Sequence, residues 1–224
     1  MGISVAAARA PEGAGTSSLS PSWTFVSILE RALAFLLLIA LIPVLVLAAV
    51  VVAFLSGRSP FVAVARAGWR GKCIWLLKLR TMWGDREPVH SSGRLVQRIA
   101  YARVPETKTQ DDPRVTSAFA AFCRKHSIDE LPQLWNVVRG DMALVGPRPL
   151  TYIELKTYYG YDAEEVLSAK PGLTGLWQAR GRNSLTYRER LALDLYLVRN
   201  WSPGLYVIVL AATLSAVISG RNAG

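Results

Sequence analysis

Apolar and polar positions divide the chain into a long uncharged segment and a mixed region that follows it. Residues 32–55 contain no charged side chain, and 24 helical residues at about 1.5 Å each exceed the ~30 Å hydrocarbon core of a bilayer. This pattern predicts a membrane segment. Pro43 lies near its midpoint and favours a kink, because it removes one backbone donor. Two topologies stay open: a straight span, and a helix-break-helix hairpin that enters and leaves one leaflet.

Between the membrane segment and the middle of the chain, the pattern predicts one hairpin and one helix. Residues 59–83 alternate short apolar runs with two glycines, which is typical of a β-hairpin. Residues 84–109 are polar and lack periodicity, so we expect a loop with one helical piece over residues 95–102. Residues 116–126 are compatible with a helix. Residues 111–114 predict a turn.

The second half of the chain predicts short elements. Residues 142–145 resemble a strand that enters a stiff loop, and residues 152–159 and 163–169 resemble short helices. Residues 174–183 predict a basic loop punctuated by glycines. We expect a helix over residues 185–200, capped by Ser184, whose leucines serve the core. The uncharged run over residues 205–219 is short for a span, which favours an interfacial or embedded helix.

Charge is concentrated after the membrane segment. From Arg58 onward 24 Lys and Arg face 14 Asp and Glu, whereas two of each sign precede it, so the net charge of +10 belongs to this region. A basic region can serve nucleic acid, an anionic lipid surface or a phosphorylated substrate. Nucleic acid is the weakest of the three, since no nucleic-acid motif occurs. Basic residues beside a membrane segment are typical of the cytoplasmic leaflet.

Cysteine and histidine give no sign of a disulfide framework or a zinc site. Cys73 and Cys123 are far apart and belong to no metal-ligand spacing, and His90 and His126 are isolated. We expect two ordinary thiols in a reducing compartment.

The adjacent carboxylates Asp129 and Glu130 form the centre of the candidate site. Basic residues flank them on both sides: Arg124, Lys125, Arg139 and Arg148. Because the planar fork of arginine matches phosphate oxygens, acids among such bases suggest an anionic, phosphorylated substrate.

A structural interpretation of the acidic pair competes with this one. The spacing from Ser127 to Glu130 is that of a capping box, which would stabilise a helix N-terminus without any catalytic role. Pro132 argues against its plain form, and in either register Asp129 lies in a first helical turn, where it stays ionised. An ionised, positioned carboxylate can be a nucleophile on phosphorus. Adjacent helical residues point about 100° apart, so we expect separate tasks for the two acids.

Four stretches, in one order, carry a family resemblance. They are LKLRTM (77–82), DPRVT (112–116), RKHSIDELPQLWNVVRGDMALVGPRPL (124–150) and KPGLTGLWQARGRNSLTYRERLALDLYLVRNWS (170–202). Together they resemble the bacterial sugar transferases, small monotopic phosphoglycosyl transferases that load a sugar phosphate onto a polyprenyl phosphate. The pattern is similar to the hexose-1-phosphate transferases that initiate exopolysaccharide repeat units.

The resemblance implies a reaction and a set of site residues. The substrates would be a UDP-sugar and undecaprenyl phosphate, with UMP as the leaving product. Asp129 would attack the β-phosphorus, and Glu130 would bind the metal or activate the acceptor, with Mg²⁺ held by both acids. The implied substrate-binding residues are Lys78, Arg80, Arg124, Arg148, Gln178 and Arg182. Gln178 and Arg182 belong to the glycine-punctuated loop, for which a purely structural turn is an equal alternative to substrate contact. For Arg66, Arg70 and Lys72, a solvated basic edge is an equal alternative to a functional role.

Two positions depart from the family pattern. Leu79 replaces the Phe of a Lys-Phe-Arg motif, and Ile42 precedes Pro43 where the family breaks its re-entrant hairpin at Ser-Pro. The missing serine hydroxyl could have satisfied a freed backbone group.

The resulting expectation is a mostly helical, membrane-associated α/β protein. Residues 1–21 would be a disordered tail, 22–57 a re-entrant hairpin broken at Pro43, and 58–202 a compact catalytic domain with short strands and interfacial amphipathic helices. Residues 203–224 would form the interfacial or embedded helix. We expect it at the bacterial inner membrane, facing the cytoplasm.

Several alternatives stay open. The sugar is expected to be galactose or glucose, with an N-acetylated or diamino sugar as the alternative. A different class of function is a non-catalytic, basic, membrane-anchored protein that binds anionic lipid or a partner enzyme. Tethering of nucleic acid is a third. Assembly into a homo-oligomer is undecided.

Overall fold

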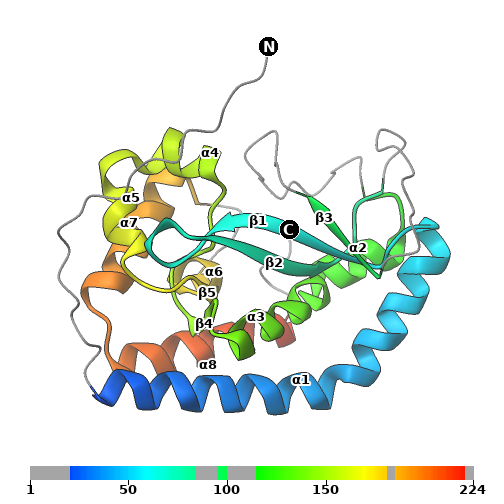
Figure 1. Ribbon diagram of the computed structural model, residues 1–224, viewed down its shortest axis with the longest axis horizontal. Coiled ribbons are helices and arrows are strands. Elements are labelled where there is room, and N and C mark those ends of the chain that lie inside the picture. The colour runs from blue at the N-terminus through cyan, green and yellow to red at the C-terminus, as the bar shows by residue number, and fades with distance from the viewer. Residues whose placement is uncertain (1–20, 84–94, 100–114, 181–184, 220–224) are drawn as a thin grey trace.

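A computed structural model describes residues 21–83, 95–99, 115–180 and 185–219 (Figure 1). The predicted N-terminal tail, the predicted turn at residues 111–114 and the candidate residue Arg182 lie outside the described residues.

Helix α1 (Pro21–Ser56) runs along one side of the molecule and bends near one end (Figure 1). Its apolar part, Phe25–Ser56, has a mean hydropathy of 3.3 over its most apolar window, of which 11% is buried. The apolar segment is therefore confirmed as a helix long enough to cross a bilayer. The helix is not interrupted at Pro43, which lies inside it, so the expected helix-break-helix form is not seen; the re-entrant topology itself stays a prediction. One missing donor bends a helix without ending it when the neighbouring hydrogen bonds persist.

The predicted hairpin is confirmed as the centre of a three-stranded sheet. Strands β1 (Phe61–Ala67) and β2 (Cys73–Leu79) are antiparallel and joined across η1 (Trp69–Gly71), and β3 (Val96–Ile99) lies parallel to β1 in the order β2-β1-β3. The helical piece expected over residues 95–102 is therefore wrong for residues 96–99. Val96 and Ile99 suit a strand, and the open edge of β1 offers backbone partners that a local pattern does not reveal.

A second, two-stranded sheet pairs β4 (Ala143–Val145) with β5 (Gly172–Thr174) in parallel. The strand expected over residues 142–145 is confirmed. The basic loop expected over residues 174–183 is partly wrong, since helix α6 (Leu176–Arg180) follows β5. Glycines allow the strands to meet this closely: a Cβ on Gly172 would overlap the backbone nitrogen of Gly146.

Helices after β4 cover one end of the sheets. The segments after Pro149 are α4 (Tyr152–Glu154), the π-helix η3 (Leu155–Tyr159), η4 (Gly160–Asp162) and α5 (Ala163–Leu167), which confirms two short helical regions. Helix α7 (Tyr187–Arg199) begins later than expected and is capped by Thr186, so the cap expected at Ser184 is wrong. Thr186 and Glu189 form a complete capping box, and a helix that begins at Tyr187 takes its cap from the residue directly before it.

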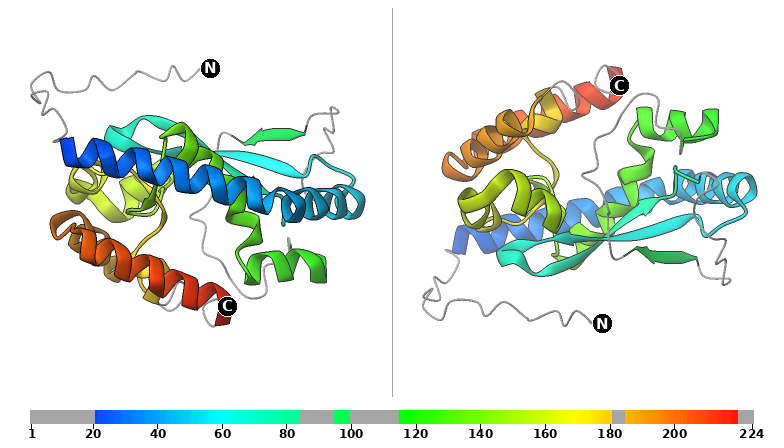
Figure 2. Two further views of the ribbon diagram at one scale, coloured as in Figure 1. Left: turned by 90° about the horizontal axis from the view of Figure 1, so that it is seen from below. Right: turned by 90° about the horizontal axis from the view of Figure 1, so that it is seen from above.

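Helix α8 (Pro203–Ser219) lies on the same side of the molecule as α1 (Figures 1 and 2). The two are joined through Glu30, whose Oε1 accepts hydrogen bonds from the Tyr206 hydroxyl (2.6 Å) and the Leu144 N–H (3.1 Å). Both helices expose apolar side chains, among them Phe25, Leu36, Leu47, Phe54, Val207 and Leu214. An exposed apolar surface of this kind is consistent with membrane association.

Candidate active site

Ser127 separates helix α2 from the element that carries the acidic pair. Helix α2 (Ala118–Lys125) is capped by Ser117 and followed by Ser127, whose φ of 56° is in the left-handed region. The 3₁₀ helix η2 (Ile128–Gln133) then carries Asp129 and Glu130 in its first turn. Within the described residues, the Ser127 side chain makes no capping hydrogen bond to η2. The capping-box interpretation is therefore wrong, and the first-turn position of Asp129 is confirmed.

Asp129 and Glu130 occupy different environments. Asp129 is buried, with 3% of its surface exposed, whereas Glu130 is half-buried and lines a small pocket. Successive side chains of a 3₁₀ helix point about 120° apart, which produces this division. On the buried side, burial and the charge of Asp129 raise the pKa of the Cys123 thiol to about 11. Cys123 is thus a neutral thiol at physiological pH.

The pocket gathers polar side chains from four separate parts of the chain. Its charged and amide side chains are Arg66, Lys78, Glu130, Gln133, Arg148 and Gln178. Three cations and one carboxylate give it a formal charge of +2, as 3 minus 1. An excess of positive charge in a partly buried pocket favours an anionic ligand. Four of the expected site residues, namely Lys78, Glu130, Arg148 and Gln178, are brought together here.

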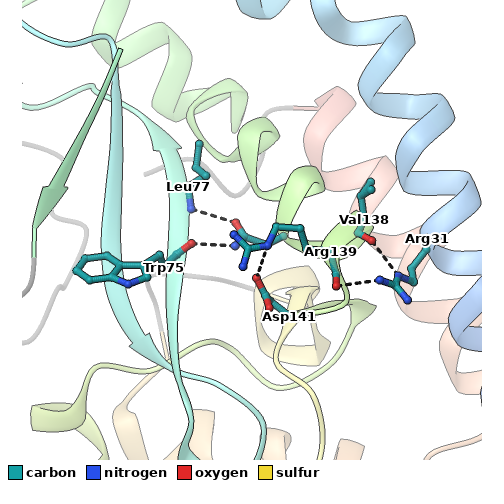
Figure 3. A network of polar contacts seen from close by, with 7 residues as sticks. Arg31, Trp75, Leu77, Val138, Arg139 and Asp141 are labelled. Carbon is teal, nitrogen blue, oxygen red and sulfur yellow. Dashed lines mark hydrogen bonds and ion pairs between the residues drawn. The ribbon is translucent and has the colours of Figure 1, made fainter. Parts of the chain in front are cut away.

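Asn136 fixes the acids against strand β2. Asn136 lies in α3 (Leu134–Arg139) and is fully buried; its Oδ1 accepts from the Leu77 N–H (3.0 Å) and its Nδ2 donates to the Trp75 carbonyl (2.8 Å). The side chain thus gives hydrogen-bond partners to backbone groups on the outer edge of β2, as a neighbouring strand would (Figure 3). Because α3 continues from η2, these two hydrogen bonds hold the segment that carries Glu130 beside the strand that carries Lys78.

Helix α1 caps the other end of α3. Arg31 donates from Nε to the Val138 carbonyl (2.8 Å) and from Nη2 to the Arg139 carbonyl (2.9 Å), as Figure 3 shows. These carbonyls would otherwise lack partners at a helix C-terminus. The apolar helix α1 is therefore linked by direct hydrogen bonds to the element that carries Asn136.

A buried acid supports the Arg148 side of the pocket. Asp194 of α7 is fully buried, and the Tyr159 hydroxyl donates to its Oδ2 (3.0 Å). Burial raises the pKa of Asp194 to about 7, although Tyr159, the Arg148 backbone and charge, and Trp177 all lower it. Burial and Asp194 in turn raise the pKa of the Tyr159 hydroxyl far above its usual range. The Arg148 guanidinium lies 5.3 Å from the centroid of the Trp177 ring.

Sequence reasoning missed Asp194, Gln133 and the role of Arg66. Asp194 is three residues from both Leu191 and Leu197, and a lone acid on such an apolar face of a helix is a signal that could have found it. Arg66 was equally compatible with a solvated basic edge, but the structure buries it, with 2% exposed. It lies on the hairpin face that also carries Ile74 and Leu76, which pack into the core.

The remaining expected residues lie elsewhere. Arg80 is buried; its Nε donates to the Ser59 carbonyl (2.8 Å) and its guanidinium bonds the Gln97 side chain. Arg124 is half-buried in the last turn of α2. Among the described residues that line the pocket, neither appears. A substrate-binding role for either residue stays a prediction.

The acidic pair offers carboxylate oxygens to a metal ion, and a Mg²⁺ site there stays a prediction. Across the described residues, no group of three His, Cys, Asp or Glu side chains could hold an ion. Mg²⁺ is commonly held by one or two carboxylates together with substrate phosphates, and the oxygens of Asp129 and Glu130 are ligands of that type.

Comparison with known proteins gives the family. Residues 22–220 match the family described as bacterial sugar transferase. The chain is 42% identical over 191 residues to the exopolysaccharide production protein ExoY of Sinorhizobium fredii, covering 85% of this chain and 84% of that protein.

Two longer relatives match over a smaller share of their length. The UDP-galactose-lipid carrier transferase of Erwinia amylovora is 39% identical over 83% of this chain and 39% of its own length. The undecaprenyl-phosphate galactose phosphotransferase of Salmonella typhimurium is 42% identical over 68% of this chain and 32% of its own length. The chain therefore belongs to the bacterial sugar transferase family, as a phosphoglycosyl transferase of the exopolysaccharide-initiating type.

Proposed function

We propose that the chain transfers a sugar-1-phosphate from a UDP-sugar to undecaprenyl phosphate, giving undecaprenyl-diphosphate-sugar and UMP. This would be the first membrane step of exopolysaccharide or glycoconjugate synthesis. The observation that carries the proposal is the pocket, which is lined by Glu130, Lys78, Arg148 and Gln178, with the buried Asp129 directly before Glu130 in the chain. One acid and three cations in the pocket, with a second acid adjacent in sequence, suit transfer of a phosphoryl group, which depends on positioning and on neutralising charge.

The proposed reaction has two displacements at one phosphorus. A carboxylate oxygen of Asp129 attacks the β-phosphorus, and the bond from that phosphorus to the bridging oxygen breaks, so UMP leaves with the electron pair. An oxygen of undecaprenyl phosphate then attacks the same phosphorus and releases the Asp129 carboxylate. The covalent aspartyl-phosphosugar intermediate is the distinguishing feature of this route.

The flanking residues would serve the charge that develops on the phosphoryl oxygens. Lys78 and Arg148 line the pocket from separate segments of the chain, and each can donate hydrogen bonds to phosphate oxygens. Asp129 and Glu130 would hold Mg²⁺, which would neutralise phosphate charge when bound. Glu130, which is half-buried in the pocket, would alternatively activate the acceptor.

The sugar is proposed to be galactose or glucose. Two relatives support it by name: the Salmonella typhimurium galactose phosphotransferase, and the undecaprenyl-phosphate glucose phosphotransferase of Komagataeibacter xylinus, which is 35% identical over 84% of this chain. A panel of donors that includes N-acetylated and diamino sugars tests this choice.

The membrane setting is proposed from the exposed apolar surface of α1 and α8. Their apolar side chains would enter the bacterial inner membrane from the cytoplasmic side, with α1 re-entrant, which would bring the site to the lipid interface. A cysteine placed in the N-terminal tail and probed from each side of sealed vesicles tests the topology. Labelling of the tail from the periplasmic side would contradict re-entrance.

Release of UMP tests the reaction. Purified protein in detergent is given each UDP-sugar with undecaprenyl phosphate and Mg²⁺, as wild type and as Asp129→Asn. We expect release from one donor, lost without Mg²⁺ and in Asp129→Asn, together with a phosphosugar adduct on the wild-type peptide that contains Asp129. Full activity in Asp129→Asn would exclude the aspartyl intermediate. Folded wild-type protein that releases UMP from no donor would favour a non-catalytic binding protein.

A further inference from the structure

The register of the hairpin separates two ends of the pocket. Cross-strand partners project from the same face of a sheet, and β1 pairs Val62 with Lys78 and Arg66 with Ile74. Arg66 and Lys78 therefore share one face of the sheet. Their Cα atoms are four residues apart along the strand direction, which is about 13 Å at ~3.3 Å per residue. Leu76 forms the pocket wall between them.

The first end, which we name the arginine end, contains Arg66 and Arg148. It is assembled where β1 meets the segment that follows Arg148: the Ala67 N–H donates to the Leu150 carbonyl (2.9 Å). No carboxylate lines this end among the described residues of the pocket.

The second end, the acid end, contains Lys78, Glu130 and Gln133. Strand β2 and helix η2 pack against each other there, and Asp129 directly precedes Glu130. The acids are thus at one end, whereas the other end offers two cations.

We propose that Arg66 binds the donor phosphate that leaves with the nucleotide, while the phosphate that carries the sugar lies at the acid end. This rests on the proposed function. Arg66 lines the pocket although only 2% of its surface is exposed, and a guanidinium so shielded from water attracts an anion more strongly than an exposed one does. Its planar fork suits two phosphate oxygens. The two phosphates of the donor share one bridging oxygen, so the long side chains of Arg66 and Lys78 would contact adjacent phosphates from the two ends, whereas the acceptor has a single phosphate.

Binding of UMP tests the assignment without turnover, because UMP carries the leaving phosphate. Calorimetry on the full chain in detergent compares wild type with Arg66→Met, which removes the charge but keeps much of the volume, and Arg66→Lys, which keeps the charge but loses the fork. Arg70→Gln is the matched control, since Arg70 is exposed in η1 of the same hairpin.

We expect Arg66→Met to weaken UMP binding about tenfold to a hundredfold, as loss of hydrogen bonds to a charged group does. Arg66→Lys should lie between it and wild type, and Arg70→Gln should match wild type. In turnover, Arg66→Met should raise the KM for the UDP-sugar and leave the KM for undecaprenyl phosphate unchanged.

An unchanged UMP affinity in folded Arg66→Met would overturn the assignment, as would a rise in the KM for undecaprenyl phosphate alone. If Arg66→Met does not fold, Arg66→Lys and Arg66→Gln test the same side chain, and wild-type UMP affinity in both would overturn the assignment equally. Failure of the wild type to release UMP would contradict the proposed reaction instead, so the two failures are distinguishable.

Discussion

The two sides of the pocket are built differently. On the β2–η2 side, neutral hydrogen bonds from Asn136 hold an edge strand, and the charged groups Lys78 and Glu130 remain partly exposed. On the β4–β5–α7 side, glycine backbones are in direct contact and a fully buried acid, Asp194, lies behind Arg148. Stability should therefore be sensitive to loss of a hydrogen bond on the β2–η2 side. On the β4–β5–α7 side it should be sensitive to added side-chain volume and to pH.

The largest expected effect is steric and falls on the β4–β5–α7 side. Gly172→Ala places a methyl group against the backbone of Gly146, where neither strand can give way without breaking the pairing of β4 with β5. We expect a loss of about 3 kcal/mol or more in the free energy of unfolding, and loss of UMP release. Thermal unfolding in detergent measures the first.

Gly204→Ala is the matched control in the first turn of α8, because the added methyl group would meet no atom of the described residues within 4 Å. It should keep the wild-type melting temperature or raise it, since alanine favours helix over glycine. Equal melting temperatures for the two variants would show that the close approach of Gly172 and Gly146 is unimportant.

The next effect falls on the β2–η2 side. Asn136→Ala removes two hydrogen bonds and leaves the Leu77 N–H and the Trp75 carbonyl without these partners. We expect a loss of about 2 kcal/mol in stability, and a lower kcat because the segment that carries Glu130 is no longer held beside the strand that carries Lys78. Asn200→Ala, whose exposed side chain donates to the Tyr196 carbonyl, should cost much less. Comparable losses in both variants would contradict this role for Asn136.

A pH effect should distinguish the two sides further. The pKa of Asp194 is about 7 in the folded protein against an ordinary 3.8, so between these values the folded state keeps a proton that the unfolded chain has released. Stability should therefore fall as pH rises from about 4 to about 7, by at most about 1.4 kcal/mol per pH unit.

Asp194→Asn should flatten this slope, whereas Asp162→Asn, at an exposed position, keeps Asp194 and should keep the slope. Chemical unfolding measured at several pH values provides the comparison. A slope of wild-type size in Asp194→Asn would assign the pH dependence to another group.

The smallest expected effect is at the link between α1 and α3. Arg31→Gln shortens the side chain that caps α3 and removes its charge, so we expect a loss of about 0.5 to 1 kcal/mol. Thermal unfolding measures it, with Arg70→Gln as the exposed control. A larger loss of stability than in Asn136→Ala would mean that the hydrogen bonds from α1 to α3 stabilise the protein more than those from Asn136 to β2.

Local sequence patterns predicted much of the fold, and the predictions that failed have a common cause. The hairpin, the membrane-length helix and the strand over residues 143–145 followed from alternation, length and turn residues. Strand β3 and helix α6 did not, because β3 depends on the free edge of β1, and α6 packs against α7 and α8, which lie further along the chain. Helix α1 continues through Pro43, since local sequence does not report whether the neighbouring hydrogen bonds persist.

For the site, the sequence by itself determined the chemical type: adjacent acids among bases, with four of the expected residues then found in one pocket. It also determined that Asp129 and Glu130 diverge, because that follows from helical geometry. The tertiary structure decided which cations face the pocket. Arg66 enters it and Arg80 bonds Ser59, and Asp194 lies behind Arg148, because burial and pairing join residues far apart in the chain, which no local pattern encodes.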